Sequence, residues 1–353
     1  MKFSFPRNLL RFKGGGKKKE EGRSRSALDI GGRSVKWLEL RGTEKPEVVT
    51  YASVPLQKGA GRENLVAAIR KVVQLSGSNS HRIHSAIGGQ SVIIRYVQLP
   101  KMTREELRSS IEFEADKYIP FNVKDVVLDC QILEEKEESG KILAVLVAAK
   151  KDAVSHYVSL LHDAGLELEL LDVDTFALAN AFEYFLGHQT PAKIHALFDL
   201  GAKTTNVNIL RGTTSLFSRG IPIGGDHFTE ALSEKLGLET DPAEVLKCSG
   251  TKSKEELLEL IAAPLETLMG EVRLSFDYFE NQYDRKIERI YLSGGSSLLS
   301  GIPEHFQNTF NVESLLWNPL QKITVPPKEE LSKLAKEGEG LGVGVGLALR
   351  RPE

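Results

Sequence analysis

The sequence predicts an α/β protein of two related domains, with a smaller subdomain inserted into the first. One observation is a strand–glycine turn–strand pattern that begins near residue 27 and returns at residue 194. A second is the length of 353 residues, which exceeds a single hydrophobic core and suits two domains with insertions. A third is a separate group of strand and helix patterns at about residues 83–165, inside the first domain.

A basic leader is expected at residues 1–26. It carries nine Lys and Arg side chains against Glu20 and Glu21, a net charge of +7 in a chain whose total is −2. The leader lacks the apolar stretch of a secretory signal. A solvated leader fits this composition, and so does weak attraction to anionic lipid headgroups, at about 1 kcal/mol per basic residue. Apolar insertion into a membrane surface would come from Phe3, Phe5, Leu9, Leu10 and Phe12.

The first core domain is expected at residues 27–82 and 166–193. Its helix at 64–75 is predicted from Leu65, Ile69, Val72 and Val73, which recur at helical spacing. The other expected elements are strands within 27–42, at 46–54 and at 166–171, a helix at 175–186 and a linker at 188–193.

The inserted subdomain is expected at residues 83–165. Thr103 precedes an apolar-periodic stretch and Glu106 follows three residues later, so a capping box begins a helix there, and Pro120 ends it. The remaining patterns predict strands at 83–87, 92–97, 126–133 and 142–149, and a helix from 152 to about 164.

The second core domain is expected at residues 194–340, with a smaller subdomain at about 226–270. It begins with the second strand–turn–strand pattern, and Arg289–Leu292 is a later strand that opens into a glycine- and serine-rich loop. Helices are predicted at 226–237, 241–248 and 253–280. A glycine-rich helix and tail follow at 341–353.

Composition excludes several classes of protein. The longest apolar run, residues 142–149, has eight residues, whereas a membrane-spanning helix needs about 20. Cys130 and Cys248 are far apart and belong to no Cys/His cluster, so neither zinc nor a disulfide is indicated. Buried free thiols in a reducing compartment explain them, which predicts a cytoplasmic protein. The sequence contains no sign of nucleic-acid recognition.

The two strand–turn–strand patterns align without a gap at an offset of 170 residues. Asp29 to Gly42 lies over Asp199 to Gly212, with the shared order Asp, aliphatic, Gly, small, basic, hydroxyl, extended strand and Arg-Gly. One Asp-x-Gly turn is ordinary hairpin punctuation. Two copies that match at this many positions, each at the start of a domain-sized segment, indicate a duplicated functional loop.

The residues of this repeat suit phosphate binding. Gly31 and Gly201 let the backbone turn tightly and approach a ligand, so that consecutive N–H groups point at anionic oxygens. The short hydroxyl donors are Ser34, Thr204 and Thr205. Asp29 and Asp199 would repel phosphate unless a divalent cation lay between them, and Mg²⁺ is held through carboxylates, phosphate oxygens and water. Lys36 could offset phosphate charge or remain exposed.

A third loop, Ser293-Gly294-Gly295-Ser296-Ser297, follows a strand and precedes an amphipathic segment. Its glycines permit the close approach of a flat ring, and a helix start would donate N–H groups. In isolation such a loop needs glycine only for its geometry. In this order after the repeat, it is predicted to contact the adenosine of ATP.

The order of these elements resembles the actin-like ATPase superfamily, with an insertion like that of FtsA. Several segments resemble the PilM family of type IV pilus assembly proteins over about residues 27–350. They are ALDIGGRSVKWLEL from Ala27, RYVQLPKMTREEL from Arg95, IEFEADKYIPF from Ile111, LDVD from Leu171, FDLGA from Phe198, SRGIPIGG from Ser218 and GLALR from Gly346. The segment at 111–121 is the most specific to the pilus group.

The resemblance implies an actin-like (ribonuclease-H-like) α/β fold and a cytoplasmic scaffold that binds ATP and Mg²⁺ at the inner membrane. It also implies that the short N-terminus of a PilN-like membrane protein docks between the inserted subdomain and the first core domain. Glu271 and Arg273 are expected on the ribose and base side, and Asp29 and Asp199 at the metal. The other implied nucleotide contacts are Gly31, Gly32, Arg33, Ser34, Lys36, Gly201, Ala202, Lys203, Thr204, Thr205, Gly224, Gly225, Gly294, Gly295 and Ser296.

Hydrolysis in this superfamily needs a polar residue that positions water, and Asp172 and Asp174 are weak candidates for it. Asp174 equally suits the start of a helix. Slow hydrolysis or none is therefore expected, with ATP fixing the shape of a docking surface. The alternatives are a polymerising ATPase like FtsA and, less favoured, a small-molecule kinase of the same superfamily.

Overall fold

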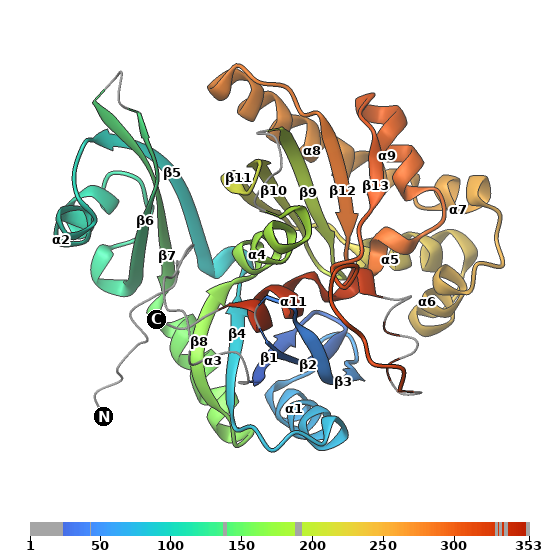
Figure 1. Cartoon of the computed structure of the whole chain (residues 1–353). Coiled ribbons are helices and arrows are strands. Elements are labelled where there is room, and N and C mark those ends of the chain that lie inside the picture. Colours follow the sequence, from blue (N-terminus) through green and yellow to red (C-terminus); the bar gives the residue numbers. More distant parts are fainter. Residues whose placement is uncertain are drawn as a thin grey trace. The chain divides into compact units, whose positions relative to one another are not determined.

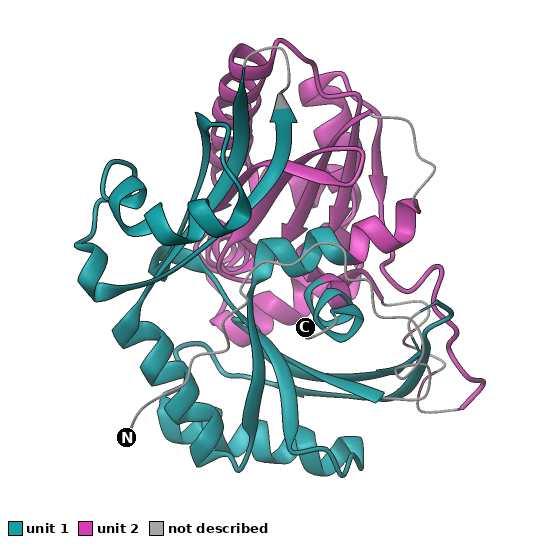
Figure 2. Ribbon diagram, turned by 60° about the vertical axis from the view of Figure 1, so that its left-hand side comes forward, with its two compact units in different colours: residues 1–180, 343–353 teal, residues 181–342 magenta. Residues whose placement is uncertain are grey.

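The computed structural model describes residues 24–42, 44–136, 140–187, 193–328, 331, 334 and 338–350. The chain divides into two compact units (Figures 1 and 2). Unit 1 comprises the described residues up to Asn180 together with those from Val343 onward, and unit 2 comprises those from Ala181 to Gly342. Unit 1 is therefore discontinuous in sequence, and unit 2 is an insertion within it.

A five-stranded sheet forms the base of unit 1, in the order β3-β2-β1-β4-β8. Its first three strands form an antiparallel meander, and β4 and β8 extend it in parallel. The strands are β1 (Ser24–Ile30), β2 (Ser34–Arg41), β3 (Glu47–Pro55), β4 (Arg82–Ile87) and β8 (Glu167–Val173). Helices α1 (Arg62–Ser76) and α3 (Lys151–Asp163) supply part of its core, in which Trp37 is fully buried.

Unit 2 repeats this topology. Its sheet has the order β11-β10-β9-β12-β13, again a meander followed by two parallel strands. The strands are β9 (Ile194–Leu200), β10 (Thr205–Arg211), β11 (Thr214–Ile221), β12 (Arg289–Ser293) and β13 (Ser314–Leu316). Its helices are α5 (Gly225–Leu236), α6 (Thr240–Ser249), α7 (Lys254–Leu260), α8 (Ala262–Tyr283) and α9 (Ile302–Phe310).

The predicted repeat extends to the register of the two hairpins. Asp29 pairs with Lys36 in the first hairpin, and Asp199 pairs with Asn206 in the second. Both pairs keep the offset of 170 residues. The duplication inferred from the sequence is therefore also a duplication of strand pairing.

A three-stranded antiparallel sheet, in the order β5-β7-β6, forms a separate part of unit 1. It consists of β5 (Val92–Pro100), β6 (Val126–Lys136) and β7 (Lys141–Lys150), with α2 (Arg104–Ala115) against one face. All residues of β7 between its two terminal lysines are buried, which explains its unbroken apolar run. The capping box at the start of α2 is confirmed, because Thr103 and Glu106 exchange both hydrogen bonds.

Two elements expected in the inserted subdomain belong to the core of unit 1. Strand β4 pairs with β1 and β8, and α3 buries Leu160 and Leu161 against the core that contains Trp37. Parallel pairing joins strands distant in sequence, so local pattern could not reveal it. The separate sheet thus starts after β4, later than the expected boundary at residue 83.

Three further expectations need correction or fall outside the described residues. Strand β1 begins at Ser24, so residues 24–26 belong to the sheet rather than to the leader, since pairing with β2 orders them. The helix expected at 253–280 is two helices, because Pro264 lacks an N–H and its ring would clash with the carbonyl four residues earlier. Residues 1–23 and the expected linker at 188–192 lie outside the described residues.

The C-terminal helix α11 (Gly342–Leu349) is held by three neighbouring strands of unit 1. Arg25 on β1 donates to the carbonyl oxygen of Ala348 and His84 on β4 to that of Leu347, each at 2.9 Å. On β8, the Asp172 carboxylate lies 3.0 Å from the Arg350 guanidinium. The last carbonyls of a helix have no partner within it, so these buried side chains cap α11.

An aromatic cluster in unit 2 encloses His195 on β9. Phe182, from the C-terminal part of α4 (Asp174–Leu186), contacts the rings of His195, Tyr291 and Trp317. Neither ring nitrogen of His195 has a hydrogen-bond partner among the described residues. Burial, and next the positive charge of Arg289, hold the pKa of His195 below its usual value.

We expect the fold to lose stability as pH falls below about 6.5, the unperturbed histidine pKa. His84 and His195 both have lowered pKa values, chiefly because burial disfavours the charged ring. The unfolded chain therefore takes up protons first, which favours unfolding by at most about 1.4 kcal/mol per pH unit for each histidine. Thermal unfolding from pH 5.5 to 7.5 measures this slope, and His195→Phe should flatten it. An unchanged slope in that variant would remove His195 from the explanation.

Within the part of the chain that the structure describes, no helix is long and apolar enough to cross a bilayer. Both cysteines are free thiols. Cys130 is buried as expected, whereas Cys248 is exposed and donates to Glu244 at 3.5 Å. The expectation of a buried thiol was therefore wrong for Cys248, which lies on the outer turn of a short surface helix.

Candidate functional site

The first glycine loop lies at the end of β1 in unit 1. Gly31 donates its N–H to the carbonyl oxygen of Ser34 at 2.9 Å, and a Cβ on Gly31 would lie 3.2 Å from that oxygen. Lys36 on β2 lies 3.6 Å from the Asp29 carboxylate. The backbone of Arg33 accepts a hydrogen bond from Leu56 at 2.7 Å, which anchors the loop to the strand end of β3.

The second loop, at the end of β9 in unit 2, makes the same turn. Gly201 donates to the carbonyl oxygen of Thr204 at 3.0 Å, and a Cβ on Gly201 would lie 2.9 Å from that oxygen. The hydroxyl of Thr205 donates to the carbonyl of Ile223 at 2.7 Å. The tight turn expected in both copies is confirmed, and its closure explains why each copy needs glycine at this position.

The start of helix α5 is seated on this second loop. Gly225 donates to the carbonyl of Gly201 at 2.9 Å, and Asp226 donates to that of Ala202 at 2.7 Å. A Cβ on Gly224 would lie 2.6 Å from the Gly201 carbonyl oxygen. Only a residue without a side chain fits this approach, so Gly224 and Gly225 belong to the loop's support.

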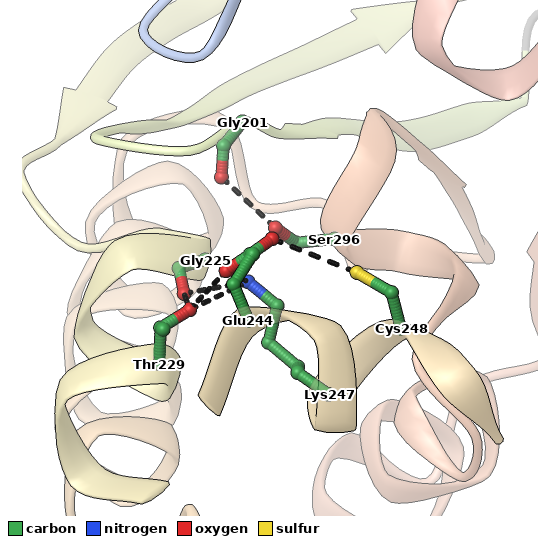
Figure 3. Close-up of polar contacts among 7 residues, drawn as sticks. All are labelled: Gly201, Gly225, Thr229, Glu244, Lys247, Cys248 and Ser296. Carbon is green, nitrogen blue, oxygen red and sulfur yellow. Dashed lines mark hydrogen bonds and ion pairs between the residues drawn. The ribbon is translucent and has the colours of Figure 1, made fainter. Parts of the chain in front are cut away.

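The third loop reaches the same place. Gly294 has φ +88°, and a Cβ there would lie 2.5 Å from the Leu200 carbonyl oxygen and 2.6 Å from an Asp199 carboxylate oxygen. The Ser296 hydroxyl donates to the carbonyl of Gly201 at 3.1 Å (Figure 3). Unit 2 thus brings together residues predicted from three separate motifs: Asp199, Gly201, Ala202, Gly224, Gly225, Gly294 and Ser296.

One detail of the third loop differs from expectation. A 3₁₀ turn, Gly295–Leu298, follows Gly294, and α9 begins only at Ile302. No α-helix start therefore lies next to the glycines. Pro303, at the first turn of α9, and the left-handed Gly301 before it fix the helix start several residues further along the chain.

A buried polar cluster behind the second loop was missed from the sequence. Lys247 on α6 donates to the Gly225 carbonyl at 3.0 Å, to Thr229 at 2.8 Å and to Glu244 at 2.6 Å (Figure 3). Burial raises the pKa of Glu244, but hydrogen bonds from Lys247 and Thr229 outweigh it and lower the pKa overall. The available signal was a Glu–Lys pair three residues apart on a short helix, which is usually only an exposed pair.

Unit 1 contains a counterpart of the third loop that sequence analysis also missed. Ile87-Gly88-Gly89-Gln90-Ser91 follows β4, as Ser293-Gly294-Gly295-Ser296-Ser297 follows β12, and both lead into 3₁₀ turns. A Cβ on Gly88 would lie 2.1 Å from the Asp174 carboxylate. The duplication therefore covers a second glycine motif, and comparing each half around its own GGxS sequence would have found it.

Glu271 and Arg273 are placed on α8. Glu271 forms an ion pair with Arg219 of β11. Arg273 donates to the Thr309 carbonyl at 3.3 Å and lies over the Phe310 ring. These contacts hold both side chains against β11 and α9, and none of them involves the glycine loops. Their expected position beside the ribose and base therefore gains no support from the structure.

The two weak catalytic candidates have different surroundings. Asp172 is fully buried, and desolvation raises its pKa even though the charge of Arg350 opposes this. Asp174 lies in the first turn of α4, where its carboxylate accepts from the Thr175 N–H at 2.7 Å. An acid in the first turn stabilises a helix, so the helix-start role suits Asp174, and Asp172 is an ion-pair partner.

The described residues include no group of three His, Cys, Asp or Glu side chains arranged to hold a metal ion. Asp29 and Asp199, the predicted metal residues, lie in different units. Each is a single carboxylate at the end of a strand. Any Mg²⁺ there would need phosphate oxygens and water for its other ligands, which is its usual preference in proteins.

The duplicated sheets and their glycine loops define the class of this protein. EutJ, an ethanolamine utilization protein from Carboxydothermus hydrogenoformans, shares the architecture with a TM-score of 0.56 and 17% identity over 93% of this chain and 89% of its own. MreB5 of Spiroplasma citri bound to ADP gives a TM-score of 0.51 and 13% identity over 92% of this chain and 95% of its own. The fold is that of the actin-like ATPases.

The family is more specific than the fold. The family model for type IV pilus assembly protein PilM matches residues 27–352. A solved PilM–PilN type IV pilus biogenesis complex contains a chain with a TM-score of 0.83 and 30% identity, over 92% of this chain and 98% of its own. This chain belongs to the PilM family of type IV pilus assembly proteins.

A more distant curated relative is the cell division protein FtsA of Helicobacter pylori strain J99. It is 22% identical over 303 residues, which are 75% of this chain. The match spans only 60% of the FtsA length. The likeness agrees with the expected FtsA resemblance in fold.

Proposed function

We propose that this chain is a cytoplasmic, ATP-binding scaffold of type IV pilus assembly that holds a PilN-like membrane protein at the inner membrane. Two separate observations support it. Unit 2 gathers three glycine motifs around Asp199, as a phosphate and adenosine site requires. A close structural relative was solved as a complex of PilM with PilN.

The residues present fit ATP with Mg²⁺. The absence of side chains at Gly201, Gly224 and Gly294 lets three backbone segments converge at the end of β9. Asp199 would hold Mg²⁺ through water and phosphate, while Lys203 and Thr204 on the loop would face the phosphates. Bound Mg²⁺ would neutralise phosphate charge. Asp29, Ser34 and Lys36 of unit 1 are proposed to act in the same way on their own loop.

Replacing Gly294 by alanine should weaken ATP binding at least about tenfold, because a Cβ would overlap the Leu200 carbonyl and φ +88° strains any L residue. Gly295→Ala is the matched control, since a Cβ on Gly295 meets nothing within 4 Å. Titration of both variants with a fluorescent ATP analogue in the presence of Mg²⁺ measures the difference. Equal affinities would argue against adenosine or phosphate at this loop.

Partner docking is proposed on the three-stranded sheet of unit 1. Its face opposite α2 carries half-buried apolar side chains around Val145 and Val147, next to Val173 and Phe176 of the core. We call this the docking face. Its exposed apolar members on the two edge strands are Val92, Ile94 and Tyr96 on β5 and Val127 and Leu133 on β6.

The experiment is a binding titration with the N-terminal peptide of the PilN-like protein encoded in the same genome. Tyr96→Ala should weaken binding at least about tenfold, as expected for an aromatic anchor. Arg95→Ala is the control, because Arg95 lies on the opposite face and donates to the Tyr118 carbonyl at 3.1 Å. If neither variant changes the affinity, the docking face is wrong, and if no peptide binds, the scaffold proposal fails.

Slow hydrolysis or none is proposed, since Asp172 is buried in an ion pair and Asp174 stabilises a helix start. Turnover should remain below about 1 s⁻¹, the low end for typical enzymes. The FtsA match favours one alternative, an ATP-dependent filament. Sedimentation with and without ATP separates the two, because a filament pellets only with nucleotide, whereas the scaffold remains in the supernatant in both cases.

A further inference from the structure

The docking face is polar along one edge. Asp129 and Gln131 of β6 lie opposite Val147 and Val145, so they project on this face, and Glu134 lies there opposite Leu143. The amide oxygen of Gln131 is buried and accepts no hydrogen bond within the described part of the chain. An occupant that brings apolar side chains, positive charge and N–H donors would satisfy every one of these groups.

Residues 1–23 have the complementary composition. They contain eight Lys and Arg residues against Glu20 and Glu21, so their net charge is +6. The apolar side chains are concentrated in the first half, and the basic cluster Lys17-Lys18-Lys19 follows three glycines. Aromatic and aliphatic anchors are provided by Phe3, Phe5, Leu9, Leu10 and Phe12.

The chain length permits these residues to reach the docking face. From Ser24, the path runs along β1 to the level where β4 ends and then along β5 to Tyr96, about ten strand residues or roughly 33 Å. Residues 13–23 span up to about 36 Å when extended. The apolar residues up to Phe12 can therefore lie against β5 and β6 of the same molecule.

We propose that residues 2–12 of this chain occupy the docking face intramolecularly and compete with the membrane partner for it. This regulation rests on the proposed function, because it acts on the same face. The apolar side chains cover Ile94 and Tyr96, and the basic side chains face Asp129 and Glu134. The partner's peptide must displace this segment to bind.

Competition lowers the partner's apparent affinity by a measurable factor. A segment tethered by a short linker has an effective concentration of about 1 mM. If its intrinsic Kd is about 0.1 mM, the partner peptide binds roughly tenfold more weakly to the native chain than to a chain whose leader cannot dock. The full-length serine-leader variant combines Phe3→Ser, Phe5→Ser, Leu9→Ser, Leu10→Ser and Phe12→Ser.

The first test compares the Kd of the partner's N-terminal peptide for the native chain and for the serine-leader variant. The expected ratio is about ten. Glu134→Lys should reduce the ratio towards one, because it repels the basic leader. Glu135→Lys is the matched control and should leave the ratio at ten, because Glu135 lies on the opposite face, opposite Ile142. A ratio of one in the native background, or an equal effect of both substitutions, overturns the proposal.

The second test does not need the partner. A photoreactive benzoylphenylalanine at Phe5 in the full-length chain should crosslink within the same molecule to residues 92–98 or 127–134. Crosslinks elsewhere, or only between molecules, overturn the proposal. Phosphatidylserine vesicles test the lipid alternative: if the native chain floats with them, the serine-leader variant does not, and the crosslink is absent, the leader is a membrane segment. Failure of peptide binding alone rejects the proposed function, and the crosslink still decides this one.

Discussion

Replacing Gly346 by alanine is expected to destabilise the fold by at least about 3 kcal/mol, the upper range for overpacked sites. A Cβ at this position of α11 would lie 1.7 Å from the carbonyl oxygen of Ala177 in α4. A backbone carbonyl cannot move aside as a side chain can, so α11 would have to leave its seat. Chemical denaturation followed by circular dichroism measures the change in the free energy of unfolding.

The same helix supplies a control of opposite sign. A Cβ at Gly344 would meet the Leu38 side chain at 3.9 Å, which is ordinary contact. Gly344→Ala should therefore be neutral or stabilise by up to about 1 kcal/mol, the helix-propensity difference between glycine and alanine. If the two substitutions had similar effects, close approach of α11 to α4 would not explain the glycines.

Removing the Asp172 carboxylate is expected to cost about 3–5 kcal/mol, because Asp172→Ala leaves the Arg350 guanidinium buried without its counter-charge. The exposed fractions of the two side chains are 0% and 3%, so solvent cannot replace the lost partner. Arginine also cannot neutralise itself by losing a proton. Thermal and urea unfolding at pH 7 measure the loss.

The opposite substitution, Arg350→Met, should cost less and depend on pH. Burial already raises the pKa of Asp172, and loss of Arg350 removes the charge that opposes this rise. The folded state then binds a proton that the unfolded state releases above about pH 3.9, so the cost of this substitution shrinks as pH falls. The combined variant Asp172→Leu with Arg350→Met should recover most of the stability. If the combined variant were as unstable as the sum of both, the pair would not be coupled.

Local chemistry explains which elements the sequence could predict. The two hairpins, the register that follows from their offset and the capping box at Thr103 depend on residues close together in the chain. The break before Pro264 was also predictable, because proline's missing N–H acts locally, and it was overlooked. By contrast, β4 joins β1 and β8 through pairing across more than 50 residues, and no local periodicity records that.

The candidate site divides in the same way. Glycine was recognised wherever a motif required a tight turn, and the structure brings the motifs of unit 2 together. The Lys247 cluster was missed because a Glu–Lys pair on a helix looks solvent-exposed until α6 is packed against the start of α5. The motif at Gly88 was missed because its neighbours were assigned to the wrong subdomain. The nucleotide-side roles of Glu271 and Arg273 were transferred from a resemblance, and their contacts with Arg219 and Phe310 do not support them.

The cap on α11 has a consequence for protein synthesis. Arg25 and Ala348 are separated by 323 positions, and Asp172 must also await Arg350 near the end of the chain. Unit 2 is contiguous and can fold while the ribosome is still translating, whereas unit 1 can close only after its final helix has been made. The first domain to be translated is therefore the last to be completed, and its unfinished sheet is the form that chaperones would encounter.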